Sequence, residues 1–253
     1  GNRISDVVKS CLRKVEANIR IVGIVDPDER GARSRLAECD QKDVVFYGNL
    51  KEMVSKAKLD ALAIGTRCNL HTPYAIEAAK YDLPLFLEKP VAISMEQAMA
   101  LERAFEKSRC RVVVSFPLRV SPLCTLARQY IEKGAVGSPE HIQAVNYVPY
   151  GTCYFDEAYR NYQITQGLFL QKATHDFDYM SYLMGDNIVR VAAMYARGRV
   201  FGGKKRAGLV CSQCDETDTC PESPQNRKRN LSGGILSDHP CVFSVDCGSP
   251  QTG

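Results

Sequence analysis

The stretch Leu-Phe-Leu-Glu-Lys-Pro at residues 85–90 decides the fold. Three apolar residues follow Pro84 and end abruptly in an acid, a base and a proline, which is typical of a buried parallel strand at its carboxyl end. Ligands of open α/β sheets bind just outside these ends, so we expect Glu88 and Lys89 to lie in a site. A lysine there can bind a phosphate, hold a substrate hydroxyl or move a proton. The alternative is a solvated turn that ends the strand.

The elements around this stretch favour the site. Apolar runs typical of strands alternate with segments of helical periodicity. The expected strands cover residues 19–25, 44–47, 59–64, 84–87 and 111–115, and the expected helices cover residues 5–15, 29–37, 50–57, 71–80 and 96–107. This alternation predicts a Rossmann-type, doubly wound parallel sheet in a dinucleotide-binding domain over residues 1–118.

The alternation ends near Pro117, and a second domain is expected over residues 119–253. Helices are expected from Ser121 to Glu132 and from Gly167 to Met184, and strands at 141–148 and 189–194. This order predicts an α+β domain with a mostly antiparallel open sheet and a cysteine-rich insertion at about residues 200–240. No strand precedes the first helix and the chain stops just after an apolar run, so we expect the sheets of both domains to be incomplete here.

Composition restricts the class of protein. The chain has 253 residues, of which 45% are hydrophobic and 25% charged, which is ordinary for a globular protein. The net charge of +4 is small and scattered, and it argues against nucleic acid as a partner. No apolar run is long enough to span a membrane, and no signal peptide opens the chain. Eleven cysteines, an odd number, fit a reducing compartment better than a disulfide scaffold, so we expect a cytoplasmic protein.

Asp26 is the first candidate cofactor-binding residue. It ends the strand after the first helix, and in dinucleotide-binding folds an acid about 20 residues beyond the glycine-rich turn binds the adenosine ribose hydroxyls. A carboxylate there repels a 2'-phosphate, which favours NAD over NADP. Gly1 would be the second glycine of Gly-x-Gly-x-x-Gly, with Ile4 in place of the third, so Gly1, Asn2 and Arg3 are further candidates. The alternative for Asp26 is a simple Asp-Pro turn.

The segment from Thr66 to His71 follows an expected strand and opens a helix. Backbone N–H groups at such a helix start can face a cofactor, so Thr66, Asn69 and His71 are candidate contacts. The alternative for His71 is that it caps the helix or packs inside the protein.

A second constellation lies in the helix expected over 167–184. Helical spacing places Gln171, Lys172 and His175 on one face, with Asp178 one turn beyond. Hydride transfer from an alcohol to a nicotinamide needs a base for the hydroxyl proton, and a histidine that titrates near neutrality suits that task. The alternative is a structural His-Asp pair inside a helical core.

These motifs, in this order, resemble the Gfo/Idh/MocA family of glucose-fructose oxidoreductases and inositol dehydrogenases. The resemblance rests on Glu88-Lys89-Pro90 and on His175 with Asp178, and it extends from Gly1 to about Val200. Further matching segments are Asp26-Pro27, Asn69-Leu70-His71, Arg119 before Ser121-Pro122, Lys133-Gly134 and Val136-Gly137. It implies a two-domain NAD(P)-dependent dehydrogenase or reductase that acts on sugars, cyclitols or related polyols, commonly as a homodimer or homotetramer.

The resemblance also implies roles for individual residues. Lys89 would contact the reacting oxygen and the nicotinamide ribose, and His175 would act as the acid or base. The family often has an aspartate where this chain has Gln171, so Lys172 would take over part of the polar work. Arg119, Gln171 and Asp178 are then candidate substrate-binding residues. Two alternatives stay open: an NAD-assisted glycoside hydrolase, and a catalytically silent NAD-binding protein.

Four cysteines near the end of the chain form a separate candidate site. Cys211 and Cys214 have C-x-x-C spacing, and Cys220 and Cys241 follow. Four thiols match the ligand number of a structural zinc, but the spacing is irregular. Free thiols or a disulfide are the alternatives.

Overall fold

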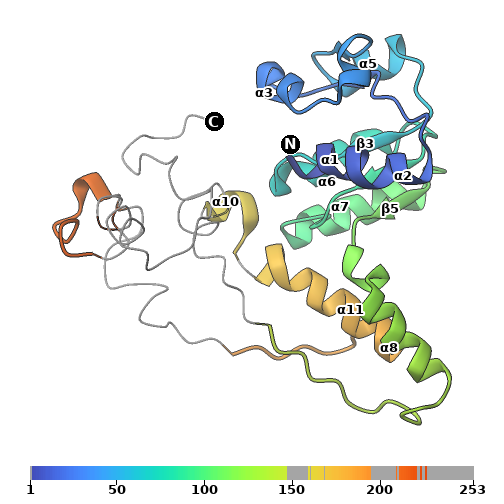
Figure 1. Ribbon diagram of the computed structural model, residues 1–253, viewed down its shortest axis with the longest axis vertical. Coiled ribbons are helices and arrows are strands. Elements are labelled where there is room, and N and C mark those ends of the chain that lie inside the picture. The colour runs from blue at the N-terminus through green and yellow to red at the C-terminus, as the bar shows by residue number, and fades with distance from the viewer. Residues whose placement is uncertain are drawn as a thin grey trace. The chain divides into compact units, whose positions relative to one another are not determined.

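The structure is a computed structural model of the whole chain, and it describes residues 2–146, 159, 161–167, 169–194, 209, 211–220, 223 and 226 (Figure 1). The chain divides into two compact units, one of residues 1–144 with 161–186 and one of residues 145–160 with 187–253. The segment with Lys89 and the helix with His175, which together form the predicted site, both belong to the first unit. The predicted domain boundary near residue 118 stays a prediction.

Five short strands confirm the parallel α/β architecture. β1 (Gly23–Ile24) pairs with β2 (Val45–Phe46), and β3 (Leu62–Ile64), β4 (Leu85–Leu87) and β5 (Val112–Val114) form a second sheet in that order. Every pairing is parallel. The break between the sheets falls between β1 and β3, where the first strand of a 3-2-1-4-5-6 order lies.

Helices follow the strands as predicted. Their bounds are α1 (Asn2–Asp6), η1 (Val7–Leu12), α2 (Arg13–Val15), α3 (Glu29–Ser34), α4 (Glu38–Gln41), α5 (Leu50–Lys56), α6 (Cys68–Ala78) and α7 (Met95–Glu106). Three of them begin at residues whose side chains accept an N–H of the first turn, namely Asp28, Asn49 and Ser94. These caps satisfy backbone donors that have no partner inside the helix.

The core lies between α6 and the second sheet. Leu85 and Leu87 of β4 are almost completely buried, as are Ala75 and Ala78 of α6. Small residues on α6 allow the helix to approach the strands closely, and β4 is the central strand of its sheet. The strand that carries the Glu-Lys-Pro motif is therefore held rigidly on both edges and one face.

A buried ion pair fixes the start of the chain. The Arg13 guanidinium contacts the Asp40 carboxylate at 2.5 Å, and the Asp40 side chain is fully buried. The same carboxylate accepts the Ile21 N–H at 2.9 Å, and Arg13 donates to the Ile19 carbonyl at 3.1 Å. Both oxygens of the buried carboxylate have partners, so the pair links α2, α4 and the segment that enters β1 without a stranded charge.

The helices beyond β5 include the second half of the predicted site. They are η2 (Pro117–Val120), α8 (Pro122–Glu132), α10 (Tyr162–Thr165), η4 (Phe169–Ala173), α11 (Thr174–Met184) and η5 (Cys211–Gln213). In the first unit, α8 and α11 lie side by side (Figure 1). Gly185 ends α11 with φ of 70°, a left-handed conformation that favours glycine.

Two predicted strands are absent from the described segments that should form them. Residues 141–146 and 187–194 have no regular secondary structure, and residues 147 and 148 lie outside the described residues. Val189 and Met194 are 96% and 97% exposed, so their alternating pattern buries nothing. A strand needs a hydrogen-bonded neighbour, and none of the described residues supplies one. Among the described residues, no helix is long and apolar enough to cross a membrane.

Candidate active site

The motif at the end of β4 is built into the protein and is not a solvated turn. Glu88 donates its N–H to the Ile64 carbonyl at 3.0 Å, which extends the ladder one residue beyond the strand, and its side chain is buried. One carboxylate oxygen lies 3.6 Å from the Arg3 guanidinium. That distance is an ion pair but exceeds a hydrogen bond, so this oxygen has no hydrogen-bond partner among the described residues. Lys89 follows, half-buried, and joins Pro90 through a cis peptide bond.

His71 holds the backbone on both sides of the motif. Its Nδ1 lies 2.8 Å from the Pro90 carbonyl oxygen and its Nε2 lies 3.1 Å from the Thr66 carbonyl oxygen. The ring is 2% exposed. With both nitrogens facing backbone carbonyls, His71 takes the packing arrangement that the sequence left open, between the end of β3 and the loop after Lys89.

Lys89 reaches the second half of the site. Its ammonium group donates a hydrogen bond to the backbone carbonyl of Gln171, which lies one helical turn before His175. The structure therefore brings together a strand tip and a helix that are more than eighty residues apart in the sequence. The Gln171 side chain is not what Lys89 contacts, so the backbone supplies the acceptor.

His175 occupies a half-buried, partly apolar position. The Phe116 ring meets the imidazole edge to face, with the centroids 5.9 Å apart. His175 Nδ1 and the neighbouring Thr174 hydroxyl are both buried and have no hydrogen-bond partner among the described residues. Buried polar atoms normally have partners, so these two are candidates to bind a polar group that the described residues do not provide.

The electrostatics of the two bases follow from burial and from their neighbours. Burial, followed by the charges of Lys89 and Lys172, lowers the pKa of His175 to about 4. Burial also lowers the pKa of Lys89, although Cys68 and Glu88 oppose the shift. At neutral pH the imidazole is therefore neutral, and its pKa lies below the near-neutral value that the sequence predicts, which makes His175 a weaker base than expected.

Arg119 and Asp178, both candidate substrate-binding residues, contact each other. Arg119 forms a bidentate pair with the Asp178 carboxylate, with Nε to Oδ2 at 3.0 Å. The Tyr182 ring lies 5.3 Å from the guanidinium of Arg119 and 5.5 Å from that of Arg128. Arg128 also donates to the Tyr182 carbonyl at 2.8 Å. These contacts join α11 to η2 and α8.

The residues predicted to contact the cofactor differ in their burial and in their hydrogen-bond partners. Asp26 lies two residues beyond the end of β1, and its carboxylate accepts the Asp28 N–H at 2.9 Å, as an Asp-Pro turn would. Asn69 Oδ1 is buried without a hydrogen-bond partner among the described residues. Thr66 is exposed and uses its carbonyl to contact His71. Gly1 lies outside the described residues, and the side chain of Asn2 is not described.

The unpartnered polar atoms fit a dinucleotide cofactor. Asn69 and Glu88 follow two adjacent parallel strands at their carboxyl ends, where open α/β sheets bind nucleotides. Thr174 and His175 add unpartnered atoms from the helix that Lys89 contacts. A bound polar molecule would supply hydrogen bonds to these four atoms, which have no hydrogen-bond partner among the described residues.

Gln97 belongs to the site, although the sequence analysis did not single it out. Its amide bonds the backbone of Ile93 in the loop after Lys89 and the backbone of Asn69 in α6. The only sequence signal for it is Ser-Met-Glu-Gln at 94–97, the pattern of a helix-capping box.

The cysteine cluster does not form a metal site among the described residues. Cys211, Cys214 and Cys220 are free thiols, and no group of three or more His, Cys, Asp or Glu in the described ranges could hold a metal ion. Cys241 lies outside those ranges. The zinc prediction therefore lacks support.

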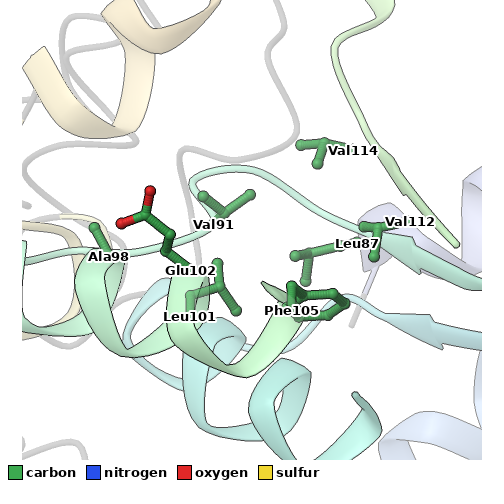
Figure 2. Close-up of a pocket in the computed structure, with 8 residues that line it drawn as sticks. All are labelled: Leu87, Val91, Ala98, Leu101, Glu102, Phe105, Val112 and Val114. Atoms are coloured by element: carbon green, nitrogen blue, oxygen red, sulfur yellow. The ribbon is translucent and has the colours of Figure 1, made fainter. Parts of the chain in front are cut away.

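An apolar groove of about 370 Å³ lies on the sheet beside α7 (Figure 2). Its lining residues are Leu87, Val91, Ala98, Leu101, Glu102, Phe105, Val112 and Val114. None of the candidate catalytic or cofactor-binding residues lines it, and its single charged group, Glu102, cannot perform the chemistry of the Lys89 site.

Family models match both halves of the chain. The model of the oxidoreductase family with an NAD-binding Rossmann fold (GFO_IDH_MocA) matches residues 3–116, and the GFO/IDH/MocA C-terminal domain matches residues 125–220. The chain belongs to the Gfo/Idh/MocA family. The resemblance inferred from Glu88-Lys89-Pro90 and from His175 with Asp178 is thereby confirmed, as is the Rossmann-type fold.

Individual relatives are distant. Bacillus subtilis YteT, which is named as an oxidoreductase without a substrate, is 24% identical over 92% of this chain and 57% of its own length. Inositol 2-dehydrogenase 1 of Saccharopolyspora erythraea is 23% identical over 72% of this chain and 51% of its own. The WlbA dehydrogenase of Bordetella pertussis, solved with NADH and UDP-GlcNAcA, shares the fold with a TM-score of 0.51 and 22% identity, over 65% and 47% of the two chains. This chain thus spans about half the length of the relatives it matches.

Proposed function

We propose that the intact protein is an NAD-dependent oxidoreductase that transfers a hydride between a nicotinamide and a secondary alcohol on a sugar- or cyclitol-like ring. The observation that carries the proposal is the contact between Lys89 and the helical turn that ends at His175. When bound, the nicotinamide supplies the hydride acceptor. The protein must then hold the alcohol oxygen and remove its proton.

Lys89 and His175 suit those two tasks. Burial lowers the pKa of the Lys89 ammonium, so it donates a strong hydrogen bond to the alcohol oxygen as negative charge develops there. His175, neutral at pH 7, accepts the hydroxyl proton. Lys172 adds positive charge near both, and Gln171 cannot ionise, so it takes no part in proton transfer. Arg119 and Asp178 orient α11 for this arrangement.

The cofactor side of the proposal rests on the ends of the strands. Asn69 and Glu88 offer unpartnered oxygens to the ribose and nicotinamide groups, with Arg3 and Thr66 beside them. The Asp26 carboxylate would repel the 2'-phosphate of NADP, which favours NAD. We therefore expect tighter binding of NAD than of NADP.

The test is a titration of the intact protein with NAD and with NADP, followed by a panel of polyols that includes myo-inositol and neutral and acidic sugars. Net NADH formation with one of them supports the proposal. Release of a sugar from a glycoside without net NADH indicates the NAD-assisted hydrolase instead. NAD binding with neither activity indicates a catalytically silent NAD-binding protein. This is the second candidate function, and it is favoured because Gln171 stands where the family often has an aspartate. Absence of NAD binding contradicts all three.

A further inference from the structure

Gln97 stands at the third position of α7 and breaks the usual form of a helix cap. Ser94 is the N-cap, and its hydroxyl accepts the Gln97 N–H at 3.2 Å. In a capping box the side chain at this position returns to the N–H of the N-cap residue. Here Gln97 Oε1 instead accepts the N–H of Ile93, one residue earlier, at 2.9 Å. The side chain therefore leaves its own helix and holds the loop before it.

The other end of the same amide holds α6. Gln97 Nε2 donates to the Asn69 carbonyl at 3.1 Å. The two partners fix the orientation of the amide, because an N–H can only face its oxygen and a carbonyl can only face its nitrogen. The Thr72 hydroxyl lies 3.1 Å from Oε1, but it has one proton and lies closer, at 2.7 Å, to the Val91 carbonyl. The bonds to Ile93 and Asn69 are therefore the ones that Gln97 supplies.

The loop after Lys89 and the start of α6 each carry one group of the candidate site. Ile93 ends the short loop that begins at Lys89, whose ammonium reaches the helix of His175. Asn69 carries the buried, unpartnered Oδ1 at the start of α6. A shift of either segment by a fraction of an ångström would move one group relative to the other. Gln97 bonds to both, beside His71 and Thr72 of α6, which contact the Pro90 and Val91 carbonyls of the same loop.

We propose that Gln97 is a positioning residue that sets the Lys89 loop and Asn69 in register, so that catalysis depends on its Ile93 bond and cofactor affinity on its Asn69 bond. The proposal rests on the proposed function, because it assigns Asn69 to the cofactor and Lys89 to the reaction. Gln97 touches neither reacting atom and acts only through the backbone of its partners.

Two substitutions separate the two bonds. Gln97→Glu keeps an oxygen for the Ile93 N–H but sets a second oxygen against the Asn69 carbonyl, where an N–H stood. Gln97→Leu removes both bonds at similar volume. Gln129→Glu and Gln129→Leu, at an exposed position of α8, are the matched controls.

For Gln97→Glu we expect NAD affinity to fall about tenfold while kcat stays within about twofold of the wild type. For Gln97→Leu we expect the same loss of NAD affinity together with a kcat at least about tenfold lower. The rescue of kcat by the glutamate is a result that a merely structural role would not give. Equal losses of kcat in both Gln97 variants, or values within about twofold of wild type in both, would overturn the proposal.

Amide hydrogen exchange of the intact protein without cofactor gives an independent readout. The Ile93 N–H should exchange faster in Gln97→Leu and at the wild-type rate in Gln97→Glu, with no change in the Gln129 controls. If the wild type shows no turnover, the proposed function fails, and NAD affinity and Ile93 exchange still decide the role of Gln97. Equal Ile93 exchange in wild type and Gln97→Leu would overturn it whatever the activity.

Discussion

The two halves of the site are anchored in different ways. Lys89 extends from a buried strand. The side chain of His71, which is 2% exposed, contacts the Pro90 carbonyl in the loop behind it. His175 lies on α11, a helix tied to its neighbours by the Arg119–Asp178 pair, in which the arginine side chain is 44% exposed. Contacts of the buried His71 ring with backbone carbonyls thus hold the lysine, and a half-exposed charge pair holds the histidine.

This difference indicates which half of the site, the lysine side or the histidine side, can move more easily. Buried hydrogen bonds with fixed geometry are costly to break, because each leaves an unsatisfied polar group. Ion pairs open to solvent are weaker and are screened by salt. We therefore expect the strand side of the site to be rigid, and the helix side to respond to ionic strength and to substitutions in α8 and η2.

The largest effect should come from the rigid half. Lys89→Met removes the ammonium group and should lower kcat by about 10³, the upper range for loss of a donor that stabilises developing negative charge, while NAD affinity changes little. Steady-state kinetics and an NAD titration of the intact protein measure both. Lys80→Met, at an exposed end of α6, is the control. Equal losses of turnover and NAD binding in Lys89→Met would mean that the lysine serves the cofactor or the fold only.

The anchor behind Lys89 should show its strength in stability. His71→Leu removes two buried contacts to backbone carbonyls and leaves those carbonyls unpaired, so we expect a loss of about 2–3 kcal/mol of unfolding free energy. Urea denaturation measures it. The exposed His141→Leu should cost less than about 0.5 kcal/mol. If both variants lose equal stability, the strand side is not held by His71.

The sequence predicted the strand half of this comparison better than the helix half. An apolar run that ends in Glu-Lys-Pro is most simply interpreted as a buried strand whose last residues reach the edge of the sheet. The strand then fixes the positions of those residues. The positions of Lys89 and His175 followed from the family resemblance, and their meeting is visible only in the structure, since spacing along the chain says nothing of contacts across more than eighty residues.

Other features could not be read from the chain because several partners were equally available to the same residue. Arg119 and Asp178 each had the charge to bind a substrate, and only the tertiary structure shows that they bind each other. Gln97 had the signal of a helix cap and instead joins the loop after Lys89 to the start of α6. Residues 189–194 have the apolar pattern of a strand. A strand also needs a neighbouring strand to pair with, and the sequence pattern does not reveal whether one is present.

The charge pair on the helix side should give a smaller stability effect than His71. Arg119→Met leaves the Asp178 carboxylate, whose side chain is 9% exposed, without its bidentate partner, and we expect a loss of about 1 kcal/mol. Adding Asp178→Asn should restore part of that loss, because the uncompensated charge is then gone. A double-mutant cycle by urea denaturation at low and high salt measures the coupling. Additive losses would mean that the pair does not tie α11 to η2.

The smallest effect should be a change in the titration of His175. Its pKa is lowered to about 4 by burial first and by Lys89 and Lys172 next. Lys172→Gln removes one cation, so protonation becomes easier and the pKa of His175 rises toward its ordinary value of 6.5. The chain has only four histidines, so imidazole NMR can follow each one. Lys9→Gln, in η1, is the control.

The same shift has a consequence for stability. The unfolded chain binds a proton at His175 near pH 6.5, whereas the folded protein binds it only near pH 4, so this residue contributes nothing above pH 6.5 and destabilises the fold as the pH falls toward 4. Lys172→Gln narrows that window, and thermal melting at pH 7 and pH 4.5 should therefore show a smaller acid-induced loss in the variant than in the wild type. An unchanged His175 titration would mean that Lys172 does not set its pKa and that burial and the charge of Lys89 lower it without Lys172.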